Sequence, residues 1–310
     1  MTKTACLLLG ALATMPWAQA QSLPQAAQAP SVFFEDFHAA SWNELAARGW
    51  MVRDAKGHPG VPGARWGAGQ VSLVPQGGGK AWLRLDAQTD GTPEGTAQAQ
   101  VCQQRKFFRG TYAARVKFSD RPVSGADGDP VVQAFYSVAP LKHDFDPEFS
   151  EVDWEYLPNG GWGSAQTRLY GLSWQTVRLD PWLSFNSSRE APGPLAEDAG
   201  QDGWHVLVMQ VDEQAVRMFI DGRLHAEHRG RNVPVVPMSI NFNLWFSPSG
   251  LLPAGPVPRQ WQQHVDWVVH VKDQQWDAAQ VMAQVKAWRA SGRHHVDTVE
   301  PSGLPTDCSF

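Results

Sequence analysis

The sequence predicts an all-β protein, a sandwich or barrel built from short strands. Between residues 31 and 275, segments of four to nine residues alternate apolar and polar side chains with a period of two. Glycine, proline, aspartate and asparagine separate these segments, as turn residues do. No helical pattern lies between them, so the strands lack the crossover helices of a parallel sheet.

The expected elements can be placed in chain order. Alternation predicts strands at 71–75, 80–88, 110–118, 204–212, 215–222, 237–246 and 264–273. Residues 206–228 read as a meander, with an Asp221–Gly222 turn before its last strand. The one helical pattern, at 276–290, places Val281, Val285 and Trp288 on one face and ends before Gly292.

These patterns divide the chain into four parts. Residues 1–20 predict a signal peptide, and the Ala/Pro/Gln-rich residues 21–30 a linker. Residues 31–275 form the expected β domain. Residues 276–310 add the helix and an irregular polar tail, packed on the same domain and tied down by Cys308. A chain of 310 residues with 43% apolar content is long enough to bury one large core or two small ones.

The first twenty residues have the three parts of a secretory signal. Lys3 supplies the positive region, residues 6–14 the apolar region, and Ala18–Ala20 an A-x-A cleavage site. The apolar run is too short for a membrane span. Cleavage after Ala20 would leave a secreted or periplasmic protein. A lipoprotein signal is the alternative, but Cys6 precedes the apolar run rather than following it.

Composition narrows the class of protein further. The formal net charge is −5 and only 18% of the residues are charged, without the basic stripe of a nucleic-acid-binding protein. The chain has 15 tryptophans, which either all belong to the core or partly line a cleft that stacks sugar faces. It has no zinc motif, phosphate loop or nucleophile elbow, so we expect no cofactor for catalysis.

Two cysteines remain once the signal is removed, Cys102 and Cys308. An exported chain with two cysteines tends to pair them. A disulfide would join the C-terminal tail to the body of the protein, and two unpaired thiols are the alternative.

The stretch FSEVDWEYLPNG, residues 149–160, concentrates acids on one face of a strand. Glu151, Asp153 and Glu155 alternate with Val152 and Trp154, so the apolar face belongs in a core and the acidic face points outward or into a cleft. Aspartate and glutamate are poor strand formers, and neighbouring like charges repel. The acids form either a solvated face or a catalytic group.

Catalysis by paired carboxylates suits this spacing. Retaining glycoside hydrolysis needs a nucleophile and a general acid/base about 5–5.5 Å apart. Residues four apart on a strand have Cα atoms about 13 Å apart, a gap that two glutamates can largely close on a concave sheet. Asp153 could then keep one neighbour protonated while the other stays ionised.

The Glu-x-Asp-x-Glu strand resembles glycoside hydrolase family 16, whose fold is a concanavalin A-like β-jelly roll. Other segments resemble that family in the same order, over roughly residues 31–272. These segments are 31–37, 107–120, 202–224, 240–246 and 264–272. The resemblance implies that Glu151 is the nucleophile, Asp153 its helper and Glu155 the acid/base. The short spacing after Asp153 is similar to the lichenase and xyloglucan-active branches rather than to the laminarinases.

The resemblance also implies the sugar-facing residues. On the late strand, Asn243 and Trp245 would face the cleft, with Asn241 two residues further back. Trp162, Tyr170 and Trp174 are candidate stacking platforms, with ordinary core or rim aromatics as the alternative.

Two further features bear on ions and substrate. Asp266 lies where family members bind a structural calcium, so it is a candidate metal ligand, or else a plain strand aspartate. Val132 and Tyr136 stand where the family usually has tryptophans, a departure at the family's usual sugar subsite on that side. The stretch RLYGLSWQT, residues 168–176, lacks the histidine that laminarinase-like members carry in a later cleft strand, so a bacterial exopolysaccharide is a candidate substrate beside β-glucan.

We therefore expect an exported, monomeric endo-glycoside hydrolase that cuts a β-linked polysaccharide by double displacement. A lectin-like, non-catalytic jelly roll and a transglycosylase on the same scaffold are the alternatives. The intact acidic triplet argues against the lectin, because sugar binding alone does not need three carboxylates at this spacing.

Overall fold

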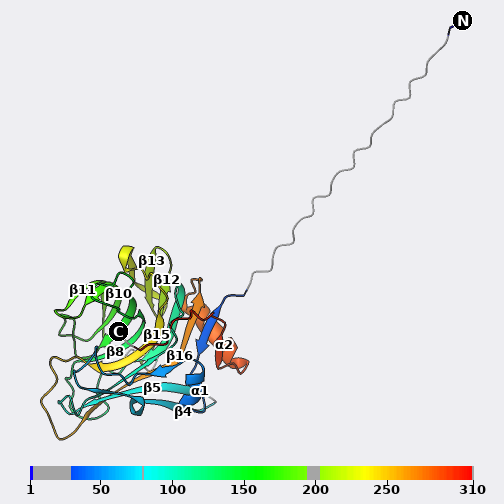
Figure 1. The fold of residues 1–310 in the computed structure, drawn as a ribbon. Helices are drawn as coiled ribbons and strands as arrows, with labels where there is room; N and C mark the ends of the chain where they lie inside the picture. The colour runs from blue at the N-terminus through cyan, green and yellow to red at the C-terminus, as the bar shows by residue number, and fades with distance from the viewer. Residues whose placement is uncertain (3–28, 79, 194–202, 309–310) are drawn as a thin grey trace.

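The alternating segments of the sequence form strands that build two sheets packed face to face (Figure 1). The computed structural model of the chain describes residues 1–2, 29–78, 80–193 and 203–308. Residues 3–20 of the expected signal peptide and residues 21–28 of the expected linker lie outside these residues. The expected all-β sandwich with a C-terminal helix is confirmed.

The elements and their bounds are as follows. The strands are β1 (Val32–Glu35), β2 (Met51–Val52), β3 (Arg65–Trp66), β4 (Val71–Gln76), β5 (Lys80–Thr89), β6 (Ala97–Cys102), β7 (Gly110–Lys117), β8 (Val131–Ala139), β9 (Ser150–Leu157), β10 (Arg168–Arg178), β11 (Leu183–Pro192), β12 (Trp204–Val211), β13 (Ala215–Ile220), β14 (Arg223–Arg229), β15 (Ser239–Phe246), β16 (Arg259–Lys272) and β17 (His295–Asp297). The helices are α1 (Trp42–Ala47) and α2 (Ala278–Ala290), with 3₁₀ turns η1 (Ala68–Gln70) and η2 (Gly230–Asn232).

One sheet, called the front sheet below, has the order β11–β10–β9–β8–β15–β6–β2, with every neighbouring pair antiparallel. The acidic strand β9 lies inside it, between β8 and β10. Glu151 is opposite Trp174 on β10, and Glu155 is opposite Tyr170. The register therefore sets the acids and two of the expected stacking residues side by side.

The other sheet, the back sheet, has the order β4–β5–β16–β7–β12–β13–β14. β1 pairs with the second half of β16, and β17 pairs with β1. The expected Asp221–Gly222 turn joins β13 to β14, and both turn residues have positive φ angles, 49° and 80°. A two-residue hairpin turn of this kind matches the twist of its strands.

The main core lies between the two sheets. On β9, Val152, Trp154 and Tyr156 are fully buried there, which leaves the three acids on the opposite face of the front sheet. Apolar residues of β8 and β15 lie on the same face of the front sheet, such as Phe135 and Phe242, whose rings stack at 5.2 Å. The period-two pattern thus directs the carboxylates away from the core.

The C-terminal helix α2 covers the outer face of the back sheet, close to β16 in Figure 1. Asp277 caps its N-terminus in a reciprocal capping box with Gln280. Val281, Val285 and Trp288 are buried, and Trp288 stacks on Phe34 of β1 with ring centroids 4.7 Å apart. The face expected to be apolar is the one that packs.

Two segments differ from the expectation. The tail beyond the helix is held by more than Cys308, because β17 pairs with β1 through residues 295–297. The short helix α1 was not expected, since its six residues are too few to show a period, although Leu45 places it on the core.

Candidate active site

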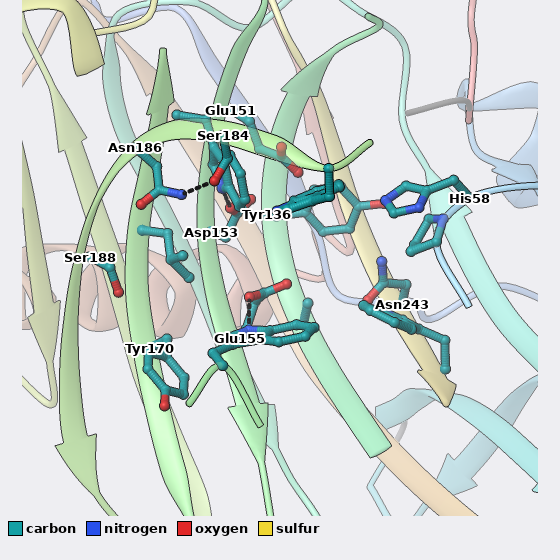
Figure 2. A pocket seen from close by; sticks show the side chains of 17 residues that line it. His58, Tyr136, Glu151, Asp153, Glu155, Tyr170, Ser184, Asn186, Ser188 and Asn243 are labelled. Atoms are coloured by element: carbon teal, nitrogen blue, oxygen red, sulfur yellow. Dashed lines mark hydrogen bonds between the residues drawn. The ribbon is translucent and has the colours of Figure 1, made fainter. Parts of the chain in front are cut away.

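The carboxylates of β9 lie at the floor of a cleft on the front sheet, opposite the core (Figure 2). Glu151 and Asp153 are almost fully buried, 5% and 2% exposed, and Glu155 is half-buried. The cleft has a volume of about 370 Å³. All eight side chains expected at the site line it: Glu151, Asp153, Glu155, Trp162, Tyr170, Trp174, Asn243 and Trp245. Asn241, further back, is fully buried and donates to Ser239 Oγ.

Two of the expected stacking residues also donate hydrogen bonds to the acids. The indole Nε1–H of Trp162 donates to Glu155 Oε2 over 2.7 Å. The indole Nε1–H of Trp174 donates to Asp153 Oδ2. These bonds hold each carboxyl in place and present the aromatic rings beside them. The sequence indicated the rings but not the hydrogen bonds.

The environment of Glu155 suits a proton donor at neutral pH. Burial in the apolar cleft disfavours the charged carboxylate and raises the pKa of Glu155 to about 7, while the hydrogen bond from Trp162 opposes this rise. A general acid works best when its pKa lies near the working pH. Glu155 can therefore give up a proton and regain it within one catalytic cycle.

Glu151 and Asp153 behave as a pair. Burial raises the pKa of both carboxyls well above the usual range, and the negative charges of neighbouring acids raise them further. Their mutual hydrogen bond acts in opposite directions, lowering the pKa of Glu151 and raising that of Asp153. This hydrogen bond therefore favours a proton on Asp153 over one on Glu151.

Unsatisfied atoms support this sharing of a proton. Glu151 Oε2 and Asp153 Oδ1 are buried and accept no hydrogen bond from an N–H or hydroxyl group within the described residues. A buried polar atom without a partner is costly. One proton held between the two carboxyls supplies the missing bond and removes one of the negative charges.

Polar and aromatic groups from neighbouring strands complete the floor and one wall. Tyr136 on β8 is 5% exposed, and burial together with the charge of Glu151 raises the pKa of its phenol, so it remains a neutral donor. Its hydroxyl interacts with the Asn243 side chain. Trp245 lies 6.1 Å from Trp162, ring centroid to centroid, and the Tyr170 hydroxyl donates to the carbonyl of Gly161.

Several lining residues were not expected from the sequence: His58, Pro59, Trp182, Ser184, Asn186 and Ser188. His58 and Pro59 come from the loop after β2, which shows no periodic signal. The other four come from the β10–β11 hairpin. β11 is an edge strand of mostly polar, exposed residues, so the sequence shows no apolar alternation that would predict a strand there.

The surroundings of Asp266 do not fit the expected calcium site. Arg289 donates to both of its carboxylate oxygens, and Arg115 donates to Oδ2 over 2.9 Å. Two guanidinium groups occupy the positions that a cation would need and would repel it. Asp266 instead joins α2 to the back sheet, since Arg289 also pairs with Asp36 of the chain after β1. In the part of the chain that the structure describes, no cluster of three or more His, Cys, Asp or Glu side chains could hold a metal ion.

The structure contains the expected disulfide between Cys102 and Cys308, which are 206 residues apart in sequence. The bond lies at the edge of the front sheet, where Cys102 ends β6. Gln100, on the same strand, donates to the carbonyl of Cys308 over 2.9 Å. The tail is therefore tied to the sheet that carries the cleft. No helix among the described residues is long and apolar enough to cross a bilayer.

Comparison with solved structures identifies the fold. A β-glucanase from Bacillus licheniformis aligns with a TM-score of 0.55 and 18% identity, over 79% of this chain and all of that one. The glycoside hydrolase family 16 endo-glucanase from Bacteroides ovatus gives 0.55 and 17%, over 76% and 98% of the two chains. An endo-1,3-β-glucanase (laminarinase) from Thermotoga petrophila RKU-1 gives 0.54 and 16%, over 78% and 98%.

The chain has the fold of these enzymes. The likeness spans nearly the whole length of each, so the expected jelly roll is confirmed. No family model and no curated protein matches the sequence. Activity must therefore be argued from the site.

Proposed function

We propose that this protein is an exported, retaining endo-glycoside hydrolase of the family 16 type, which cuts a β-linked polysaccharide internally. One observation carries the proposal. Three carboxyls alternate on one strand at the floor of a tryptophan-lined cleft, and burial and their mutual charges raise their pKa values to different extents, that of Glu155 to about 7. Pairs of acids whose environments separate their pKa values have the division of roles that glycoside cleavage needs.

In the first step, an oxygen of the ionised Glu151 attacks the anomeric carbon of the bound sugar. The bond from that carbon to the glycosidic oxygen breaks, and Glu155 gives its proton to the leaving oxygen. The product is a glycosyl ester on Glu151. The negative charge leaves Glu151 as the ester forms and appears on Glu155 as it loses its proton, so the net charge of the site is unchanged.

In the second step, the ionised Glu155 takes a proton from a water molecule, whose oxygen attacks the same anomeric carbon. The ester bond to Glu151 breaks and its electron pair returns to the carboxylate. Asp153 keeps its proton throughout and donates it to the Glu151 oxygen that is not bonded to sugar. Two inversions leave the product with the configuration of the substrate.

The substrate class follows from the walls of the cleft. Trp162, Trp174 and Trp245 offer flat apolar rings, while Tyr136 and Asn243 offer hydrogen-bonding groups close to the acids. Pyranose rings have apolar faces and polar edges, and this mixture suits them. The similar structures include β-glucanases, so we propose β-glucan, or an exopolysaccharide with β-linkages, as the substrate.

Export is part of the proposal. The sequence predicts a cleaved signal, and the disulfide between Cys102 and Cys308 suits an oxidising compartment. A polysaccharide of high molecular weight is met outside the cell rather than inside it. The protein acts as a monomer in this proposal.

The test is reducing-end release by the mature protein from mixed-linkage glucan, xyloglucan, laminarin, agar and bacterial exopolysaccharides. Glu151→Gln should abolish release while its melting temperature stays close to that of the parent. Glu148→Gln is the matched control, because Glu148 is exposed, pairs with Lys142 and lies outside the cleft. A folded and fully active Glu151→Gln protein would refute the assignment. Binding without release would favour the lectin or the transglycosylase.

A further inference from the structure

Trp182 stands at the tip of the β10–β11 hairpin and borders the cleft on the side of Glu151. Its ring lies against two others. The His58 imidazole is 5.6 Å away at an interplanar angle of 30°, and Trp174 meets it edge-on at 6.0 Å. The side chain is nevertheless 51% exposed. A large aromatic ring is thus fixed in orientation while much of its surface stays open to the cleft.

The loop that carries His58 is held in place from below. Arg53 is 5% exposed, and its guanidinium donates to the carbonyls of Ala55, Gly57 and His58 over 2.8–3.0 Å. The same group donates to Gln100 Oε1 of β6 over 3.0 Å. Every nitrogen of this buried guanidinium is therefore committed to the loop or to the sheet beneath it. The His58 imidazole against which Trp182 packs is therefore held in place before any ligand binds.

The loop of His58 and the hairpin of Trp182 meet from opposite edges of the front sheet. His58 follows β2 at one edge, and Trp182 precedes β11 at the other. Figure 2 shows Asn186 and Ser188 along one side of the cleft and His58 at the other side. Their contact extends the cleft outward past Trp174, which already lies beside the acids.

Polar groups accompany this aromatic surface. Ser184, Asn186 and Ser188 occupy alternate positions on β11 and all three line the cleft. Asn186 Nδ2 donates to Ser184 Oγ over 3.3 Å, and Asn186 and Ser188 are exposed. A flat apolar ring next to a row of small hydroxyl and amide groups suits one chemical class, a sugar ring with its apolar face and its hydroxyl edge.

We propose that Trp182, backed by His58, is a further sugar-binding site that stacks a pyranose ring of the polysaccharide beyond those held over the carboxylates. The inference rests on the proposed function, since the ligand is the same polysaccharide chain continuing along the cleft. It makes Trp182 a determinant of the chain length that the protein prefers. Short oligosaccharides that end over the acids do not reach it.

The experiment measures binding without turnover, in the Glu151→Gln background. Affinity electrophoresis in gels that contain mixed-linkage glucan, xyloglucan, laminarin, agar or a bacterial exopolysaccharide with β-linkages first selects the polysaccharide that retards the protein. Calorimetry then follows oligosaccharides of two to eight units prepared from that polysaccharide. Trp182→Ala is compared with Trp182→Phe and with Phe185→Ala. Phe185 is an exposed aromatic residue of the same hairpin that packs toward Phe145 and does not line the cleft.

We expect Trp182→Ala to weaken binding of the longest oligosaccharides about tenfold and that of disaccharides not at all. Trp182→Phe should recover part of the loss, and Phe185→Ala should bind as the background does. If Trp182→Ala binds oligosaccharides of every length as tightly as the Glu151→Gln background does, the inference is overturned while the proposed function stands. An equal loss at every length also overturns it, because it would show a general effect on the cleft. If no polysaccharide retards the Glu151→Gln protein, both the inference and the proposed function fail.

Discussion

Replacing Trp162 with phenylalanine tests whether Glu155 is the proton donor. The change keeps an aromatic ring on the wall of the cleft but removes the indole N–H that donates to Glu155 Oε2. That bond stabilises the ionised carboxylate and lowers the pKa of Glu155, against the rise that burial causes. Without the bond, the pKa of Glu155 must rise.

The size of the rise can be worked out from the contact. A hydrogen bond to a charged group contributes about 1.5–3 kcal/mol. Trp162 is 46% exposed, so water screens the interaction and the lower end of that range applies. One pKa unit corresponds to about 1.4 kcal/mol, so we expect a rise of about one unit. The pKa of Glu155 would move from about 7 to about 8.

The assay is the pH dependence of kcat/KM on the preferred polysaccharide. Glu155 must be protonated to act as the acid, so activity falls as the pH rises through its pKa. The alkaline limb should therefore move about one unit upward in Trp162→Phe, while the acidic limb, which reports Glu151, stays in place. A lower overall kcat/KM from weaker stacking would not move either limb.

Trp245→Phe is the matched control. It is a tryptophan of the same wall, and its buried Nε1 donates to no group in the described part of the chain. Its alkaline limb should coincide with that of the parent. An unmoved or lowered alkaline limb in Trp162→Phe would refute the assignment of Glu155 as the acid.

The remaining predictions concern catalysis and stability. Glu155→Gln should lower polysaccharide hydrolysis about 10²–10⁴-fold and remove the alkaline limb of the pH profile, because no titrating acid remains. Reducing the bond between Cys102 and Cys308 should lower the free energy of unfolding by about 2–4 kcal/mol, seen in thermal unfolding with and without reductant; equal melting temperatures would contradict this. Asp129→Ala should cost about 3–5 kcal/mol in urea unfolding, since it leaves the buried Arg259 guanidinium unpaired, and a loss below 1 kcal/mol would count against that pairing.

The sequence predicted which side chains of the front sheet face the cleft, because a residue's position along a strand decides on which face of the sheet its side chain lies. Glu151, Asp153 and Glu155 face the cleft because Val152 and Trp154 face the core, and alternation alone determines that. The same parity placed Asn243 and Trp245 correctly. Their catalytic and binding roles stay predictions.

The features that could not be predicted from the sequence depend on contacts between segments that are distant in the chain. The loop of His58 and the hairpin of Trp182 have no periodic pattern, and they meet only because β2 and β11 end the same sheet. The ion pairs of Asp266 were not expected for a related reason. Its partner Arg289 comes from a helix 23 residues later, and a resemblance to a family carries no information about that particular ion pair.

The disulfide has a consequence for when the cleft becomes complete. Cys308 is bonded to Cys102, its carbonyl accepts a hydrogen bond from Gln100, and Gln100 accepts one from Arg53, which holds the His58 loop. Reduction would release Cys308 from β6 and weaken the contacts that support Gln100, Arg53 and the His58 loop beside the cleft. Thiols oxidise outside the reducing cytosol. For the exported protein proposed above, the bond could form only after translocation, and the His58 side of the cleft would gain this support only then.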